Sequence, residues 1–298
     1  MALRTAIPRM TLNRLQNLRN SSFPVCVAAA DTPSIRRHLE WARRAATING
    51  RLLDSAVKCV TYWAHQLHSS IDGRGLQQAG KVPAAHSWVS DGTKLMKGTD
   101  FINAVHVRIN AIPTRSRCAR GRDLDRLCRA GCRAKETLAH VAQHCARTYV
   151  ARHRRHNNVC THIATRLRSY GWHVQLERHL ATSAGLRKPD IVASRNNFVA
   201  VIDAQVVGCG RSLEDLHQQK ALKYNTEEIR GLLVKDTGAE CIFTSATVSL
   251  RGVWSRDSAK DLLCLGLSKN DLKLMSIKAL QGTVYAWHLF NKATARIH

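Results

Sequence analysis

One short stretch, residues 188–207, constrains the fold more than any other part of the chain. Apolar and β-branched residues flank the dipeptide Asn196-Asn197 on both sides, which is the pattern of two antiparallel strands joined by a two-residue turn. Asparagine tolerates the positive φ that both central residues of a type I′ turn require. Such a turn fixes the register, so that residues whose numbers sum to 393 face each other, Asp190 with Asp203 among them.

This register places two carboxylates side by side. Directly opposed side chains have Cβ atoms about 4.5 to 5.5 Å apart, and like charges at that distance destabilise a sheet. Two opposed acids therefore require a cation between them, and magnesium characteristically takes one or two carboxylates together with substrate phosphate. The hairpin predicts a magnesium site at Asp190 and Asp203. The alternative is a surface hairpin whose register is shifted by one residue, which would separate the two acids.

The residues that follow the hairpin favour a site over a chance alignment. Ser212, with Asp215 three residues later, has the pattern of a helix N-cap. The helix that begins there carries Lys220, Lys223 and Tyr224 at positions i, i+3 and i+4, which lie on one face. Two amines and a phenol therefore lie on one face of the helix that follows the two acids in the sequence.

Lys188-Pro189-Asp190, Asp203 after twelve intervening residues, and Lys220 to Tyr224 together resemble the restriction-like endonuclease of certain non-LTR retrotransposon polyproteins. These elements have one open reading frame and insert site-specifically, typically in ribosomal RNA genes. The motif belongs to the wider PD-(D/E)XK nuclease superfamily, whose lysine lies two residues after the second acid on the same strand. Gln205 occupies that position here. The resemblance implies that the lysine has moved to the following helix, as Lys220.

The resemblance implies a magnesium-dependent DNA endonuclease. Asp190 and Asp203 would hold the ion, Lys220 would orient or help activate a water, and Lys223 and Tyr224 would complete the catalytic group. The enzyme would nick double-stranded target DNA in the nucleus and leave a 3′ hydroxyl that primes reverse transcription by the rest of the polyprotein. Element RNA is a further implied partner. The chain lacks the adjacent aspartates of a polymerase palm, so we expect no reverse transcriptase activity from it alone.

The charge of the chain indicates a polyanionic partner. Lys and Arg number 46 against 21 Asp and Glu, a formal net charge of +25. No segment approaches the roughly 18 apolar residues of a membrane span, so nucleic acid rather than a membrane is the predicted partner. From Arg108 to Arg155 there are thirteen Arg or Lys and only three acids. This excess favours phosphate contacts, although a solvated charged surface is the simpler interpretation.

A second pattern lies inside this basic stretch. Ten cysteines without a secretory signal predict metal ligation in a reducing, intracellular compartment. Two closely spaced cysteines form a turn onto zinc, and a following helix supplies the other two ligands. The candidates are Cys128, Cys132, His140 and Cys145. A CCHC knuckle of this spacing directly precedes the endonuclease in the family that the chain resembles.

The fourth zinc ligand has an alternative. On a continuing helix, His144 shares a face with His140, whereas Cys145 is rotated by about 140°. Helix geometry alone would choose His144, and the family pattern chooses Cys145, for which the helix must end near Gln143. We favour Cys145 because thiolate is the stronger zinc ligand. Cys118 is an outside candidate.

A predicted helix over residues 147–170 follows the knuckle and begins with a basic cluster. Within this cluster Arg155-His156-Asn157 matches a basic motif of the related endonucleases, which implies DNA contact near the scissile phosphate. A soluble helix end is the alternative interpretation. The predicted DNA-binding residues are Arg152, Arg154, Arg155, His156 and Lys188.

The predicted fold is α/β, a restriction-endonuclease-like mixed sheet flanked by helices. Its order is a helix, a strand over 171–177, the hairpin, the Lys220 helix, a strand over 239–250 and a helix capped by Ser268. Three domains are expected: a mainly helical linker region over 1–110, the zinc knuckle over 111–147 and the endonuclease over 148–298. The linker region includes a predicted hairpin over 87–96 with a turn at Asp91-Gly92.

Two rival functions belong to other classes. The chain could be a catalytically inactive nucleic-acid-binding remnant or a domesticated zinc-knuckle protein, and it could be a zinc-finger transcription factor. Both would bind DNA without cleaving it under any metal.

Overall fold

A computed structural model describes residues 46–48, 50–53, 55–234 and 239–295. The chain divides into two units, residues 1–70 and 71–298. In the described part of the first unit, β1 (Ala46–Ile48) pairs antiparallel with β2 (Arg51–Leu53), and α4 (Ala56–Ser69) follows. Ser55 caps α4 by accepting a hydrogen bond from the backbone N–H of Lys58 at 3.2 Å. The predicted boundaries at residues 110 and 147 stay predictions.

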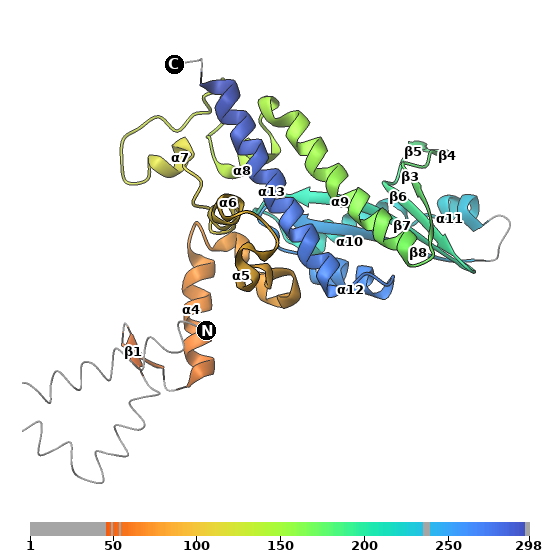
Figure 1. Cartoon of the computed structure of the whole chain (residues 1–298), viewed down its shortest axis with the longest axis horizontal. Coiled ribbons are helices and arrows are strands. Elements are labelled where there is room, and N and C mark those ends of the chain that lie inside the picture. The colour runs from red at the N-terminus through yellow and green to blue at the C-terminus, as the bar shows by residue number, and fades with distance from the viewer. Residues whose placement is uncertain (1–45, 49, 54, 235–238, 296–298) are drawn as a thin grey trace, which may run out of the picture. The chain divides into compact units, whose positions relative to one another are not determined.

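The second unit is built on a four-stranded mixed sheet (Figure 1). Its strands, in spatial order, are β3 (His173–Leu176), β6 (Ile191–Arg195), β7 (Phe198–Val207) and β8 (Glu240–Ser249). The pairs β3–β6 and β6–β7 are antiparallel, whereas β8 runs parallel to β7. The parallel pair is joined through α10 (Leu213–Tyr224) and α11 (Glu227–Val234), which is the helical crossover that a parallel connection needs.

The predicted register of the hairpin is confirmed. Arg195 pairs with Phe198, and Ile191 pairs with Ile202, so paired residue numbers sum to 393. The predicted turn type is wrong in one respect, because only Asn196 of the two asparagines has a positive φ, at 52°. A positive φ at one residue is a conformation that asparagine tolerates.

Helices cover both faces of the sheet. On one face lie α9 (Tyr149–Ser169), α12 (Arg256–Cys264) and α13 (Lys269–Thr294), and α9 and α13 run side by side in Figure 1. Successive β7 side chains point to opposite faces. Ala200, Ile202 and Ala204 therefore join the core under α9. Val201 packs instead with Tyr224 of α10 and Ile229 of α11. By the same alternation, Asp203 lies on the α10 face.

The remaining described elements lie outside this sheet. A small antiparallel hairpin, β4 (Leu180–Thr182) and β5 (Gly185–Arg187), is inserted between β3 and β6. The other helices are α5 (Trp88–Asp91), α6 (Gly98–Arg108), α7 (Arg115–Cys118) and α8 (Leu138–Gln143). The 3-10 turns are η1 (Arg74–Leu76), η2 (Ala79–Lys81), η3 (Pro83–His86), η4 (Gly92–Lys94) and η5 (Ala146–Thr148). No described helix combines the length and apolar character that crossing a membrane requires.

The predicted hairpin over residues 87–96 is wrong. The segment forms α5 and η4, and Gly92 adopts a φ of 60° between them. Trp88 is fully buried, and its ring meets Phe101 of α6 edge-on at 5.8 Å between centroids. The pattern of a short apolar segment does not distinguish a strand from a helix. Here the segment is helical, and its Trp88 packs into the core.

The close approach of α9 and α13 depends on Gly282. A Cβ at this position would lie 2.6 Å from Cβ and 2.8 Å from Cδ of Arg155. Arg155 is 2% exposed, and its guanidinium donates to Thr283 Oγ1 at 2.9 Å and to the carbonyl of Ala142 at 3.1 Å. The glycine thus leaves room for a buried cation that links α8, α9 and α13.

We expect Gly282→Ala to destabilise the protein by about 1–3 kcal/mol, because the new methyl group must displace the base of the Arg155 side chain. Gly231→Ala in α11 is the matched control, since a Cβ there meets nothing within 4 Å. Alanine is also the better helix former by about 1 kcal/mol. Urea unfolding of both variants measures the difference. A Gly282→Ala protein as stable as wild type would contradict the packing argument.

Candidate active site and metal centre

Asp190 and Asp203 meet at one end of the β6–β7 hairpin. Asp203 lies in β7 and is 3% exposed. Asp190 directly precedes β6, and its Oδ2 accepts a hydrogen bond from the backbone N–H of Ala204 at 2.7 Å. The two carboxyl groups are close enough to interact directly. The structure therefore brings together the two acids that the predicted register opposes.

Lys220 completes this two-carboxylate site, which we define as Asp190, Asp203 and Lys220. The ammonium of Lys220, on α10, forms an ion pair with Asp203 Oδ2 at 2.5 Å. Ser212 caps the same helix by accepting from the N–H of Asp215 at 3.3 Å, as predicted. Because Asp203 points to the α10 face of the sheet, the helix can place its amine against the second acid.

The other two predicted catalytic residues differ in position. Tyr224 is buried, and its hydroxyl donates to the carbonyl of Lys188 at 3.2 Å and approaches Asp203 Oδ1 at 3.5 Å. Lys223 donates to the Tyr224 hydroxyl at 3.1 Å. Tyr224 therefore belongs to the surroundings of the site, and Lys223 is joined to the site through Tyr224.

The two acids have opposite pKa shifts. Burial alone would raise the pKa of Asp190, but hydrogen bonds from His156 and from the N–H of Ala204 hold that pKa below its ordinary value. Burial raises the pKa of Asp203, and the charge of Asp190 adds to this effect against the opposing influence of Lys220. A single ammonium thus offsets the repulsion only in part. A divalent cation would relieve the remainder, and an arrangement of carboxylate oxygens suits magnesium.

Gln205 stands where the wider nuclease motif has its lysine, and the structure gives it a structural role. Its side-chain amide donates to the carbonyl of Leu216 at 2.9 Å and to Thr247 Oγ1 at 2.7 Å. These bonds connect β7 to α10 and to β8. The residue therefore holds the lysine-bearing helix on the sheet.

The predicted DNA-binding residues fall into three groups. Arg154 and Lys188 are exposed. Arg152 donates to the carbonyl of Cys145 at 2.7 Å, and its guanidinium lies over the ring of Tyr149. The prediction for Arg155 is corrected, because this residue is buried and its hydrogen bonds go to other parts of the protein. An i, i+1 pair on a helix cannot present both members to one surface.

His156 lies beside the two-carboxylate site. Its Nε2 is 3.1 Å from Asp190 Oδ1 and 3.4 Å from the sulfur of Cys160. The hydrogen bond with Asp190 raises the pKa of His156. Cys160 was missed by reasoning from sequence, although His-x-x-x-Cys within one helix places both side chains on one face.

The cysteine cluster, defined as Cys128, Cys132, His140 and Cys145, has the geometry of a zinc centre. The four ligand atoms all lie within 4.8 Å of one another. The sulfurs of Cys132 and Cys145 are 3.7 Å apart, and two thiolates each about 2.3 Å from a tetrahedral zinc ion would be about 3.8 Å apart. His140 Nε2 is buried without a hydrogen-bond partner, so it is available to a metal.

Local structure explains how these four side chains meet. Gly131, with a φ of 78°, lies between the first two cysteines, and Arg133, with a φ of 54°, directly follows the second. Helix α8 ends at Gln143, where the helix must end for Cys145 to turn inward. His144 is exposed and stands outside the cluster, as does Cys118. The geometry thus favours Cys145 over both alternatives.

The electrostatics of the cluster suit a cation. Burial raises the pKa of the Cys128 thiol, and burial and neighbouring thiols raise that of Cys145 to about 12. Burial lowers the pKa of His140, so the imidazole is neutral and can act as a ligand. Zinc would ionise the thiols with release of protons. The residues present fit a structural Cys₃His zinc site.

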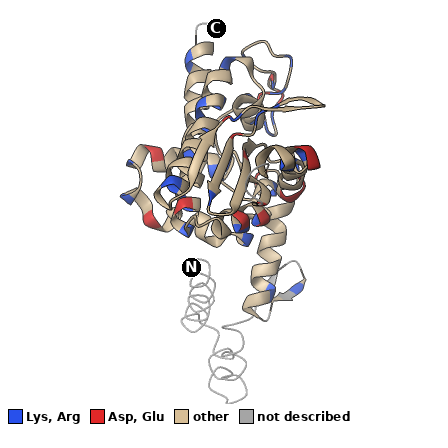
Figure 2. Ribbon diagram, turned by 90° about the vertical axis from the view of Figure 1, so that its right-hand side faces the viewer, with Lys and Arg blue, Asp and Glu red and all other residues tan. Residues whose placement is uncertain are grey.

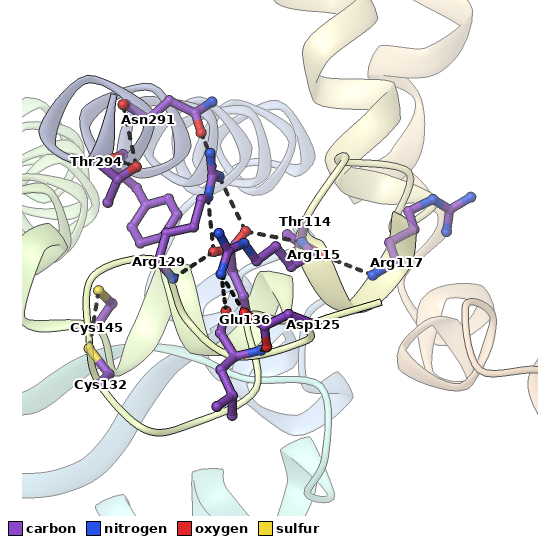
Figure 3. A network of polar contacts seen from close by, with 12 residues as sticks. Thr114, Arg115, Arg117, Asp125, Arg129, Cys132, Glu136, Cys145, Asn291 and Thr294 are labelled. Atoms are coloured by element: carbon purple, nitrogen blue, oxygen red, sulfur yellow. Dashed lines mark hydrogen bonds and ion pairs between the residues drawn. The ribbon is translucent and has the colours of Figure 1, made fainter. Parts of the chain in front are cut away.

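A buried carboxylate joins the cluster's loop to α13 (Figure 3). Glu136 is fully buried and accepts from Arg129 Nε at 3.0 Å and from the backbone N–H of Arg115 at 3.0 Å. Arg129 also donates to Asn291 of α13 at 3.0 Å, and its guanidinium lies over the ring of Phe290. The loop is therefore docked onto the long C-terminal helix.

Several arginines of the basic stretch are paired internally, so fewer face solvent freely than the sequence indicates. Arg115 pairs with Asp125 at 2.6 Å, and Asp72 holds Arg117 at 2.9 Å and Arg120 at 2.6 Å. A hollow of about 720 Å³ nevertheless has a basic lining. Its cationic residues are Arg74, Arg117, Arg120, Arg126, Lys135 and Arg251. Figure 2 marks where charged residues of both signs lie along the ribbon.

Comparison with known proteins shows which proteins the chain is similar to. It is 37% identical over 97% of its length to the retrovirus-related Pol polyprotein of the type-2 retrotransposable element R2DM of Drosophila melanogaster. It is 31% identical over 99% of its length to the corresponding protein of the type-1 element R2 of Nasonia vitripennis, and 35% identical over 80% to that of Bradysia coprophila. No protein-family model matches the chain.

These relatives confirm the predicted resemblance to polyproteins of non-LTR retrotransposable elements. The chain belongs to the Pol polyproteins of R2 elements in particular. It spans about 28% of the length of the three relatives named above.

The cysteine cluster generates a prediction for metal content. Cys145→Ala should lose the zinc ion of the cluster and lower the melting temperature, because the loop then lacks one of four ligands. His144→Ala, one residue earlier, should keep both the zinc content and the melting temperature of wild type. Zinc per chain by atomic emission, together with thermal unfolding, tests the pair. Zinc loss in His144→Ala but not in Cys145→Ala would reverse the assignment.

Proposed function

We propose that this chain is a magnesium-dependent DNA endonuclease region of an R2-type polyprotein. The observation that carries the proposal is the meeting of Asp190, Asp203 and Lys220 at the end of one hairpin. Support also comes from the order of helices and strands, which agrees with a restriction-endonuclease-like core. The similarity to R2 polyproteins supports the same function, since a retrotransposable element must open its target DNA before insertion.

The geometry suggests a role for each residue. Asp190 and Asp203 would hold magnesium, which when bound supplies positive charge that stabilises phosphodiester hydrolysis. Lys220 is placed to orient a water and to add positive charge next to the phosphate as negative charge builds. Tyr224 braces the second acid and the Lys188 carbonyl, while Lys223 adds a further cation. The backbone N–H of Ala204 orients Asp190.

Nucleic acid would approach over exposed cations. Arg154 and Lys188 are exposed, His156 stands beside Asp190, and Arg152 lies one helical turn before His156. The basic hollow, which is lined in part by Leu138 and Ala139 of α8, offers a second region for phosphate contacts. We propose double-stranded target DNA as the substrate, element RNA and the remainder of the polyprotein, including a reverse transcriptase, as partners, and the nucleus as the location. The nick would leave a 3′ hydroxyl for priming.

Nicking of supercoiled DNA in magnesium tests the proposal. Asp203→Ala and Lys220→Ala should each lower the nicking rate by at least about 100-fold and leave DNA affinity within a few fold. Lys260→Ala, which removes an exposed lysine of α12, is the matched control and should nick like wild type. Wild-type protein that binds DNA but nicks it under no divalent metal would favour a nucleic-acid-binding protein without catalysis.

A further inference from the structure

A second group of potential metal ligands adjoins the two-carboxylate site. His156 and Cys160 lie one turn apart on α9, and Asp190 approaches them from the start of β6. One ligand atom from each of the three lies within 4.8 Å of the other two. The group therefore combines a nitrogen, a sulfur and an oxygen donor at one point.

The separations between these donor atoms are close to those of metal ligands. Ligand atoms about 2.0–2.3 Å from a tetrahedral ion are about 3.3–3.8 Å apart. His156 Nε2 is 3.1 Å from Asp190 Oδ1 and 3.4 Å from the sulfur of Cys160. Small adjustments of the three side chains would thus place an ion between them. His156 Nε2 lies near the donor atoms of both Asp190 and Cys160.

The chemistry of the donors selects the kind of ion. Magnesium prefers oxygen ligands, whereas zinc takes imidazole, thiolate and carboxylate together. Three protein ligands also leave the fourth tetrahedral position open. The side chain of His156 is 33% exposed and that of Asp190 is 17% exposed, so an ion can enter from that side, while Cys160 is 8% exposed beneath them.

We propose that His156, Cys160 and Asp190 form a second metal site that binds a soft divalent ion such as zinc and thereby competes with magnesium for Asp190. Asp190 Oδ2 is engaged by the N–H of Ala204, which leaves Oδ1 as the oxygen that both ions would use. Zinc bound here draws Oδ1 toward α9 and away from Asp203. Micromolar zinc would then inhibit an enzyme that needs magnesium between its two acids, which is a regulatory property of the site.

The metal-binding part of this inference is tested without any activity measurement. Protein carrying one zinc ion in the cysteine cluster is titrated with cobalt(II), and the thiolate-to-cobalt absorption is followed. Wild type should bind one further equivalent with a thiolate band. Cys160→Ala and Cys160→Ser should lose that band, and His156→Ala should lose it too. Circular dichroism reports whether each variant is folded, and the serine variant preserves side-chain volume.

Cys264→Ala is the matched control, because this exposed cysteine stands outside both ligand groups. It should keep the second equivalent and the band. A band that persists in folded Cys160→Ser, or no second equivalent in wild type, overturns the metal site.

The proposed inhibition by zinc rests on the proposed nuclease function. It is measured separately, as the rate of DNA nicking. Equimolar zinc should reduce magnesium-dependent nicking by wild type and spare Cys160→Ala. Equal inhibition of both proteins would overturn the competition. A chain that binds the second cobalt ion but never nicks would instead count against the nuclease function alone, so the two failures are distinguishable.

Discussion

The β6–β7 hairpin is the constraint on which the rest of the site depends. Its register opposes Asp190 to Asp203, and the N–H of Ala204 on the neighbouring strand holds one oxygen of Asp190. A shift of one residue would turn Asp203 to the α9 face, away from Lys220. Strand pairing therefore positions the two carboxylates.

The helices around the sheet convert that register into a chemical environment. Helix α10 brings Lys220 to one side of the acids, and α9 brings His156 and Cys160 to another. Asp190 thus lies between two groups of neighbours. One is Asp203 with Lys220, and the other is His156 with Cys160. In the two proposals made above, this one carboxylate would connect the magnesium site with the second metal site.

The cysteine cluster and the sheet are linked through α13 and two arginines, the half-buried Arg129 and the buried Arg155. Arg129 connects the loop of the cluster to Asn291, and Arg155 links α8 and α9 to Thr283 in the gap left by Gly282. A buried guanidinium needs several acceptors to offset its desolvation, so these contacts specify one arrangement of the helices. Part of the basic excess of the sequence is therefore used inside the protein.

Local sequence patterns predicted the hairpin register, the helix caps at Ser212 and Ser268 and the order of helices and strands. The spacing of the cysteines predicted the cysteine cluster. These features depend on turns, caps and short spacings, which act over a few residues. Helix geometry alone would choose His144 as the fourth ligand, but α8 ends at Gln143, and Cys145 joins the cluster instead. The tertiary structure alone decided that Trp88 belongs to a helix, that Arg155 is buried and that Cys160 reaches Asp190. Each of these depends on partners far along the chain, and no local pattern encodes which distant side chain will fill a given space.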